Sequence, residues 1–230
     1  MKWGSGVFNE RKHLMLRLLS VGVFGVAMAF LEASVVVYLR QLYYPGGFAF
    51  PLVRIPERMI LIECGRELAT IVMLISVSLW LGNTRWSRFG WFAFVFGIWD
   101  LFYYVWLRLL LKWPATLLDP DILFLVPLPW IGPVVAPIAI ALTMCVIGVA
   151  LVVIERDGPV YKPGVVAWAL GVLGTALLLY AFMYDVHAGL RLQPLLPFPY
   201  GLLAAGLACY WAGFSLSLRR SRQDAQRAGR

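Results

Sequence analysis

Apolar residues form long runs along the chain, and short stretches with charged, proline and glycine residues separate them. Each run is close to the roughly 20 residues that an α-helix needs to cross the hydrocarbon core of a bilayer. The runs cover Leu14–Leu39, Met59–Leu81, Phe89–Leu111, Val134–Ile154, Gly164–Tyr184 and Pro199–Leu218. We therefore predict an all-α, polytopic integral membrane protein with about six transmembrane helices, formed by a single domain over residues 1–218 and a basic tail over residues 219–230.

One apolar stretch does not fit this pattern. The segment Ile122–Pro133 contains Pro127, Pro129 and Pro133. Prolines at this density remove backbone donors and break helices. Two interpretations stay open: the segment is interfacial or re-entrant, or it is a proline-kinked entrance to the fourth span.

The composition supports the membrane class. The chain of 230 residues is 61% hydrophobic and 14% charged, whereas soluble domains have about 45–50% apolar and about 25% charged residues. The first apolar run continues to Leu39, which is longer than the apolar region of a signal peptide, so we predict an uncleaved first span. Cys64, Cys145 and Cys209 lie in apolar stretches without metal-binding spacing and are expected to be free thiols.

The distribution of basic residues predicts the orientation. Lys and Arg concentrate in the termini and in the second and fourth loops, and the alternate loops contain fewer of them. The richer side has Lys2, Arg11, Lys12, Arg17, Arg85, Arg88, Arg156, Lys162, Arg219, Arg220, Arg222, Arg227 and Arg230, against Arg40, Arg54, Arg58, Arg108, Lys112 and Arg191. The positive-inside rule then places both termini in the cytoplasm, and we expect the bacterial cytoplasmic membrane. Topology and anionic lipid explain the net charge of +8, so a nucleic-acid partner is not needed.

Acidic residues inside the predicted spans are the strongest functional signal. They are Glu32, Glu63, Glu67 and Asp100, and Arg66 is the basic residue among them. A carboxylate in hydrocarbon costs about 2.5 to 3.5 kcal/mol on insertion scales, so such residues usually face the bundle interior and serve function. The predicted orientation places all four in the outer half of the membrane.

Helical spacing places these residues on packing faces. Gly22, Gly25 and Ala29 continue into Glu32 at steps of three and four residues. Ala93, Gly97, Asp100 and Tyr104 do the same in the third span, and Gly171, Gly174, Leu178, Phe182 and Asp185 in the fifth. Small residues mark the faces where membrane helices approach closely. We therefore expect the carboxylates to point away from lipid.

Two interpretations of Glu63, Arg66 and Glu67 compete. In the structural one, Arg66 neutralises one glutamate and clasps the helices. In the functional one, the uncompensated carboxylates bind a cation or carry protons, because buried like charges do not stay ionised together. A bound cation is therefore a candidate cofactor, and its identity is open.

Several outer residues are candidate accessories to this cluster. Asp119 and Asp121 could supply oxygens to a cation, although a turn with Asp121 capping the next segment is the favoured interpretation. Arg108 could hold an anionic headgroup, and His187 is a weak candidate ligand near Asp185. Trp99, Tyr103, Tyr104 and Trp106 surround Asp100 in the sequence and could line a lipid or quinone pocket, although packing is the more common role of such aromatics.

Three functions follow as hypotheses. The favoured one is a multi-pass membrane protein whose outer-facing acidic cluster binds or passes a cation or protons, alone or with other membrane subunits. The second is a membrane-embedded enzyme that acts on a lipid-like substrate at the outer leaflet. The third is a structural subunit of a membrane complex whose charges form inter-helix ion pairs. We find no nucleotide-binding, zinc-protease or serine-hydrolase motif that would choose between them.

Overall fold

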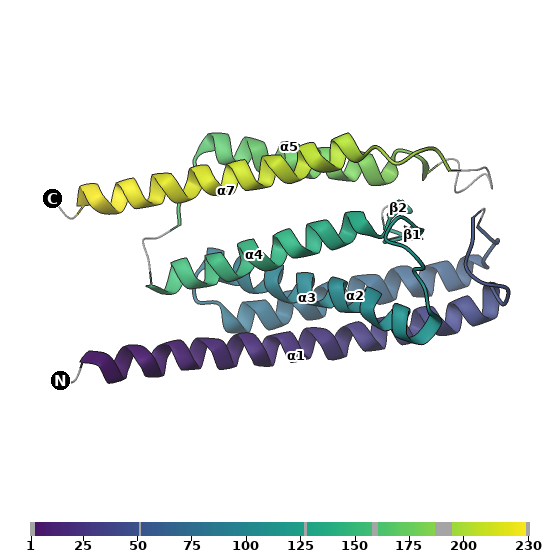
Figure 1. The fold of residues 1–230 in the computed structure, drawn as a ribbon, viewed down its shortest axis with the longest axis horizontal. Coiled ribbons are helices and arrows are strands. Elements are labelled where there is room, and N and C mark those ends of the chain that lie inside the picture. The colour runs from purple at the N-terminus through teal and green to yellow at the C-terminus, as the bar shows by residue number, and fades with distance from the viewer. Residues whose placement is uncertain (1–2, 51, 127, 158–160, 187–194, 229–230) are drawn as a thin grey trace.

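The chain forms a bundle of long helices that run along a common axis (Figure 1). The computed structural model describes residues 3–50, 52–126, 128–157, 161–186 and 195–228. The helices in these ranges are α1 (Trp3–Tyr43), α2 (Glu57–Leu81), α3 (Arg85–Leu111), α4 (Val135–Asp157), α5 (Val165–Met183) and α7 (Tyr200–Ala228). The strands β1 (Pro120–Ile122) and β2 (Ile131–Pro133) form the small sheet between α3 and α4.

The helical membrane architecture that the sequence predicts is confirmed in its main feature. Among the described residues, 5 helices are long and apolar enough to cross a membrane, namely α1, α3, α4, α5 and α7. Helix α2 is not in this group, although its 25 residues make it long enough. Its first half contains Glu57, Arg58, Glu63, Arg66 and Glu67. The sixth span therefore stays a prediction.

The helices α1 and α7 extend beyond the apolar runs at both ends of the chain. Helix α1 begins at Trp3, and α7 continues through most of the basic segment to Ala228. Alanine, arginine and glutamine favour helix, and no proline follows Pro199 to stop α7. In the last turns of α7, the Ser221 hydroxyl accepts the backbone N–H of Lys162 at 3.1 Å. The predicted tail is thus helical as far as Ala228 and contacts the segment before α5.

Small residues allow close helix approach on the faces that the spacing predicts. Gly90 of α3 and Gly148 of α4 face each other, because a Cβ added at either one would lie within 3.0 Å of the other's carbonyl oxygen. A Cβ at Gly97 would meet Ala141 and Cys145 in the same way. These contacts support the predicted faces, since Gly25 of α1 packs against Ile98 of α3 and Gly97 of α3 packs against α4.

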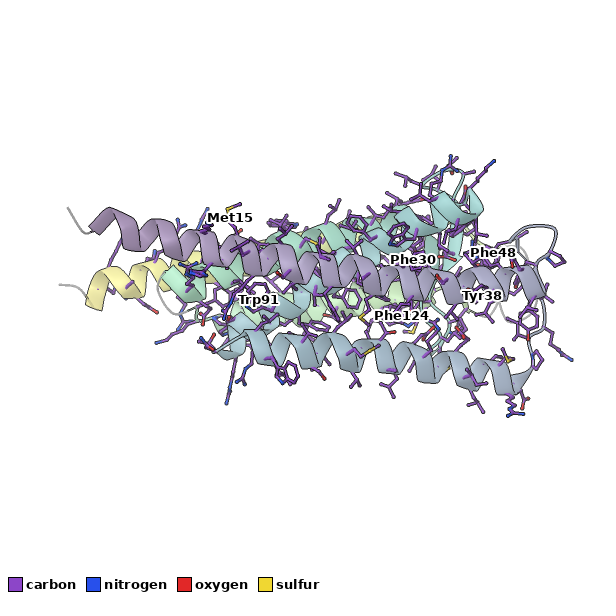
Figure 2. All side chains as sticks on the ribbon, turned by 90° about the horizontal axis from the view of Figure 1, so that it is seen from below. Met15, Phe30, Tyr38, Phe48, Trp91 and Phe124 are labelled. Atoms are coloured by element: carbon purple, nitrogen blue, oxygen red, sulfur yellow. The ribbon has the colours of Figure 1, made fainter. Side chains whose placement is uncertain are left out.

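The bundle consists of two parts with separate apolar cores. Residues of α1, α2, α3 and α4 form the larger core around Trp91, Phe94 and Leu74. Helices α5 and α7 pack mainly against each other and touch the rest at few positions. A smaller core around Leu178, Phe182 and Ala136 joins this pair to α4 near the β-hairpin. Trp91 lies between the helices, 2% exposed, whereas Met15 points outward from α1, 71% exposed, as expected of a lipid-facing residue (Figure 2).

The proline-rich segment between α3 and α4 is an antiparallel hairpin. Strand β1 pairs with β2 in the register Pro120 to Pro133 and Ile122 to Ile131. Leu123 N–H donates to the Trp130 carbonyl at 2.8 Å, which continues the pairing beyond the strands. Of the two interpretations of this segment, the proline-kinked entrance to the fourth span is wrong, because α4 begins only at Val135, and the interfacial or re-entrant position stays a prediction. The prolines disfavour helix but permit a short hairpin.

The close approach of α3 and α4 predicts that one methyl group at Gly148 destabilises the bundle. A Cβ there would lie 2.6 Å from the Gly90 oxygen and from the Phe94 nitrogen, so backbone has to move. We expect Gly148→Ala to cost about 1–3 kcal/mol, the usual range for overpacking. Thermal unfolding in detergent measures the loss. Gly65→Ala is the matched control, since a Cβ at Gly65 meets nothing within 4 Å. Equal melting temperatures for the two variants would contradict the packing.

Candidate functional site

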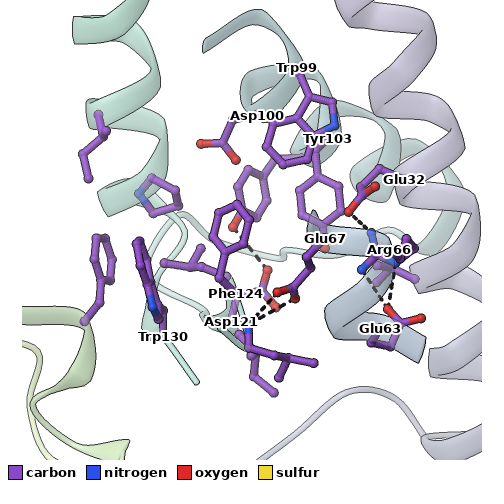
Figure 3. Close-up of a pocket in the computed structure, with 18 of the residues that line it drawn as sticks. Glu32, Glu63, Arg66, Glu67, Trp99, Asp100, Tyr103, Asp121, Phe124 and Trp130 are labelled. Carbon is purple, nitrogen blue, oxygen red and sulfur yellow. Dashed lines mark hydrogen bonds and ion pairs between the residues drawn. The ribbon is translucent and has the colours of Figure 1, made fainter. Parts of the chain in front are cut away.

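A cavity of about 340 Å³ lies where the hairpin meets the helices. Its walls come from α1, α2, α3, the hairpin, α4 and the α5 and α7 pair, and most of the lining is aromatic or aliphatic. The charged residues that line it are Glu32, Arg40, Glu63, Arg66, Glu67, Asp100 and Asp121. The structure thus places all four predicted acidic residues and Arg66 on one cavity (Figure 3).

Arg66 ties two helices together on one side of the cavity. Its Nη2 lies 2.7 Å from Glu63 Oε2 on the same helix, and its Nη1 forms an ion pair with Glu32 of α1. The Thr70 hydroxyl donates to Glu32 at 3.1 Å and fixes the second oxygen. Arg66 therefore pairs with two glutamates, not with one as the sequence interpretation assumed. The spacing of Glu63 and Arg66 predicted the pair within α2, but the partner on α1 needed the fold.

Glu67 anchors the hairpin to α2. The backbone N–H of Leu125 donates to both of its carboxylate oxygens, at 3.1 and 2.9 Å. Backbone N–H groups are strong partners for a carboxylate that is buried. Glu67 is buried, at 7% exposed. Its contact with Leu125 holds an irregular segment at a fixed position against a helix. Its role in the structure is a tie between two elements.

A buried ion pair that the sequence interpretation missed ties α1 to the hairpin. Arg40 Nη2 lies 3.0 Å from Asp121 Oδ1, and the Tyr104 hydroxyl donates to Asp121 Oδ2 at 3.2 Å. The Arg40 guanidinium also lies over the rings of Phe48 and Trp113, at 4.2 and 3.7 Å from their centroids. The two cation–π contacts hold the guanidinium in place between the rings. The expectation that Asp121 caps the next segment is wrong, because its side chain points inward to Arg40.

The environment of Asp121 shifts its protonation. Burial raises the pKa of Asp121 to about 6, and the Arg40 guanidinium opposes this shift without reversing it. Asp121 is 2% exposed. The cost of removing its carboxylate from water therefore exceeds the stabilisation that one ion pair and the hydrogen bond from Tyr104 provide.

Asp100 differs from the other carboxyls of the cavity. It lies near the middle of α3 and lines the cavity beside Trp99 and Tyr103. Among the described residues, no cation and no hydrogen-bond donor contacts it, and no dashed line reaches it in Figure 3. Its electrostatic neighbour is Asp121, which has the same charge. An isolated carboxylate in an apolar environment is strongly disfavoured unless a proton or a cation neutralises it.

Some donors around the cavity are also unpaired. The indole N–H groups of Trp99 and Trp130 and the Nη1 of Arg40 are buried without a hydrogen-bond partner in the described part of the chain. Trp99 and Arg40 are 4% and 7% exposed. Leaving a buried donor unpaired costs about 1–3 kcal/mol. The cavity therefore combines an apolar lining with donors and one carboxyl that lack protein partners.

The predicted accessory residues separate into two groups. Tyr104 and Asp121 lie at the cavity, as do Trp99 and Tyr103. Arg108 and Asp119 do not, because each of them closes the loop after α3. Arg108 donates to the carbonyls of Lys112 and Pro114 at 2.6 and 2.8 Å, and Asp119 accepts the N–H of Ala115 at 2.7 Å.

The remaining aromatic and polar candidates lie elsewhere. Trp106 donates to the Val26 carbonyl at 3.1 Å and packs on Phe30, so it joins α3 to α1 and does not line the cavity. Asp185 accepts the N–H of Leu196 at 2.6 Å near the end of α5. His187 lies outside the described residues.

Most of the acidic side chains that share the cavity are held by partners inside the protein. Within the described ranges, no group of three or more His, Cys, Asp or Glu side chains is placed to hold a metal ion. Glu32, Glu63, Glu67 and Asp121 are each engaged with a partner inside the protein. The three cysteines are free thiols, as the sequence predicts.

Comparison with family models, with curated proteins and with solved structures finds no match to this chain.

The Arg40–Asp121 pair predicts a strongly non-additive mutant cycle. Arg40→Met leaves the buried Asp121 without its counter-charge, and Asp121→Leu leaves Arg40 without its own, so each is expected to cost about 3–5 kcal/mol. The double variant removes both charges and is expected to recover most of the loss. Thermal unfolding of the three variants in detergent measures the coupling. Additive losses would show that the two side chains do not act as a pair.

The shifted pKa of Asp121 predicts a pH-dependent stability. Its pKa is about 6 in the folded protein against an ordinary 3.8, so the folded state binds this proton more tightly. The associated stability is present below about pH 4 and is lost as the pH rises to about 6. We expect the melting temperature of the parent to fall relative to that of Asp121→Asn over this interval. A constant difference between the two proteins across the interval would rule out the shift.

Proposed function

We propose that the chain is a multi-pass membrane protein that binds and exchanges a proton at Asp100, in a cavity in the outer half of the bilayer. The observation that carries the proposal is the isolation of Asp100 among the described residues, in contrast to the four cavity carboxyls that have partners. Carboxyls of this kind inside membrane helices mark proton and ion pathways.

The orientation follows from the arrangement of the helices and the charges. The first turns of α1 and the last turns of α7 lie at the same end of the bundle, and the hairpin lies toward the other end (Figure 1). The end with the termini has the larger number of lysines and arginines. The positive-inside rule then favours cytoplasmic termini and an outward-facing hairpin. If the membrane is the bacterial cytoplasmic membrane, the cavity faces the periplasmic half.

The geometry favours a proton over a metal ion as the bound species. Hard cations such as calcium take about six to eight oxygen ligands, whereas a proton needs a single carboxylate. The neighbours of Asp100 in the cavity are mostly aromatic, with Trp99, Tyr103 and Phe124 among them. Asp121, the like charge that acts on Asp100, is already held by Arg40.

The other carboxyls support a structural role within the same protein. Glu32 and Glu63 converge on Arg66, and Glu67 holds the hairpin. These contacts are the inter-helix ties that the structural hypothesis requires. We therefore assign the ties to Glu32, Glu63 and Glu67 and the proton chemistry to Asp100.

The proposal predicts selective modification of Asp100 by a membrane-soluble carbodiimide. Carbodiimides add to protonated carboxyl groups and leave a stable N-acylurea, which peptide mass spectrometry locates. We expect modification of Asp100 at neutral pH and none at residue 100 of Asp100→Asn. Glu67→Gln is the matched control, because it removes a different cavity carboxyl and is expected to leave Asp100 reactive.

Two outcomes of this experiment would overturn the proposal. One is an unreactive Asp100 in a folded protein whose other membrane carboxyls react. The other is a reaction that sodium or calcium suppresses and choline does not, because a metal ion and not a proton would then occupy the carboxylate. A rate that falls as the pH rises, without an effect of these cations, supports proton binding.

A further inference from the structure

A second cavity lies next to the first, deeper along the helices. It measures about 460 Å³ and lies between α3 and α4 on one side and α5 and α7 on the other. Its walls are mostly apolar, with Phe89, Ile147, Leu151, Val172 and Phe214 among the lining residues.

The two cavities share a wall. Ile140 and Met144 of α4, Thr175 of α5 and Tyr210 of α7 line both of them. The Thr175 and Tyr210 hydroxyls lie 2.8 Å apart and form a hydrogen-bonded pair at this junction. The two cavities therefore adjoin at this wall, between the two parts of the bundle, and the pair of cavities is called the cleft here.

The packing of α5 against α7 explains why this cleft exists. Gly174 and Gly206 bring these helices into close contact, since a Cβ at Gly174 would lie 2.9 Å from the Gly206 oxygen. Helices α5 and α7 therefore pack mainly against each other, and they contact α4 mainly at the smaller core, around Leu178 and Phe182. Away from that core, the space between α4 and the pair is not filled by side chains.

The charges at the polar end of the cleft select the kind of head group. Among the described residues, Arg66 is shared by two glutamates and Arg40 is paired with Asp121, and the other charged groups of the lining are carboxyls, so the lining has no excess positive charge to favour a phosphate or a carboxylate. A hydroxyl group fits better, because it can donate to a carboxyl oxygen and accept from a carboxyl proton. The unpaired indole N–H groups of Trp99 and Trp130 are further donors on the same lining.

We propose that this cleft binds a long-chain amphiphile with an uncharged, hydroxyl-bearing head. The apolar chain occupies the second cavity, and the head lies in the first cavity beside Asp100. Both cavities fall within the range of about 300–1,000 Å³ that is usual for small-molecule sites. The assignment of the head rests on the proposed function, since it pairs the hydroxyl with the proton-binding carboxyl, whereas the chain site stands on the cleft alone.

Tryptophan fluorescence tests the site directly. Trp86 and Trp168 line the second cavity, so a chain with a bromine atom quenches their emission when it binds there. The probes are hexadecanol, hexadecanoate and hexadecyl phosphate, each brominated on the chain, added to the protein in detergent. We expect hexadecanol to bind at least about tenfold more tightly than either anion, a difference of about 1.4 kcal/mol. Equal affinities would overturn the head assignment.

A glycine in the wall supplies a variant that fills the cleft. Gly171 lines the second cavity, and a Cβ there meets nothing within 4 Å, so Gly171→Leu adds volume to the cavity without a backbone clash. Gly65→Leu is the matched control on α2, where a Cβ also meets open space outside both cavities. Saturable quenching that Gly171→Leu abolishes and Gly65→Leu retains supports the chain site. Equal quenching in both variants would mean that the probe partitions only into detergent around the protein, and would overturn it.

Carbodiimide modification separates this inference from the proposed function. Bound hexadecanol without bromine is expected to slow the modification of Asp100 in the parent and to have no such effect in Gly171→Leu. Modification of Asp100 without saturable binding of any chain overturns only the cleft. Saturable binding that depends on Gly171, with an unreactive Asp100, overturns only the proton site.

Discussion

A charged side chain between membrane helices has to find its partner inside the protein, because the bilayer offers neither water nor counterions. This requirement explains the contacts around the cavity. Arg66 bridges α1 and α2, Arg40 bridges α1 and the hairpin, and Glu67 joins α2 to the hairpin. Each contact spans two elements and fixes their relative position in addition to the apolar packing. The positions of α1, α2 and the hairpin therefore depend on these ties.

The hairpin shows how far this dependence extends. Its sequence cannot form a helix, and a pair of three-residue strands is too short to be stable alone. Asp121 and Leu125 supply two of the groups that the helices hold, one through a side chain and one through a backbone N–H. Trp130 stacks on Phe182 of α5, with ring centroids 6.0 Å apart, and extends the contact to the second part of the bundle. Ties and stacking together let an irregular segment form one wall of a cavity.

Much of the fold and the location of the acidic residues could be predicted from the sequence, since both depend on local periodicity. Apolar runs of helical length mark the helices, and the spacing of Gly25 and Glu32 marks a packing face. Pairings between distant residues could not be predicted in this way. Arg40 and Asp121 are 81 positions apart and Thr70 and Glu32 are 38 apart, so no helical period relates them. The sequence does place Asp121 in an apolar stretch after an outer loop, which is a signal that it needs a partner.

The same requirement for partners explains why we assign Asp100 a different role from the other carboxyls. A carboxyl that served only to hold helices together would be expected to have a cation or a backbone donor within reach, as Glu67 and Asp121 do. Asp100 instead faces a space that α4 and the α5 and α7 pair leave open, next to an apolar cleft that continues along the helices. To close this space, helices α1 to α4 would have to pack fully against α5 and α7. The small residues Gly174 and Gly206 instead lie between α5 and α7, where they bring these two helices together. The unpaired carboxyl and the unfilled cleft are thus two consequences of one packing arrangement, in which the bundle is joined near the hairpin and open beside it.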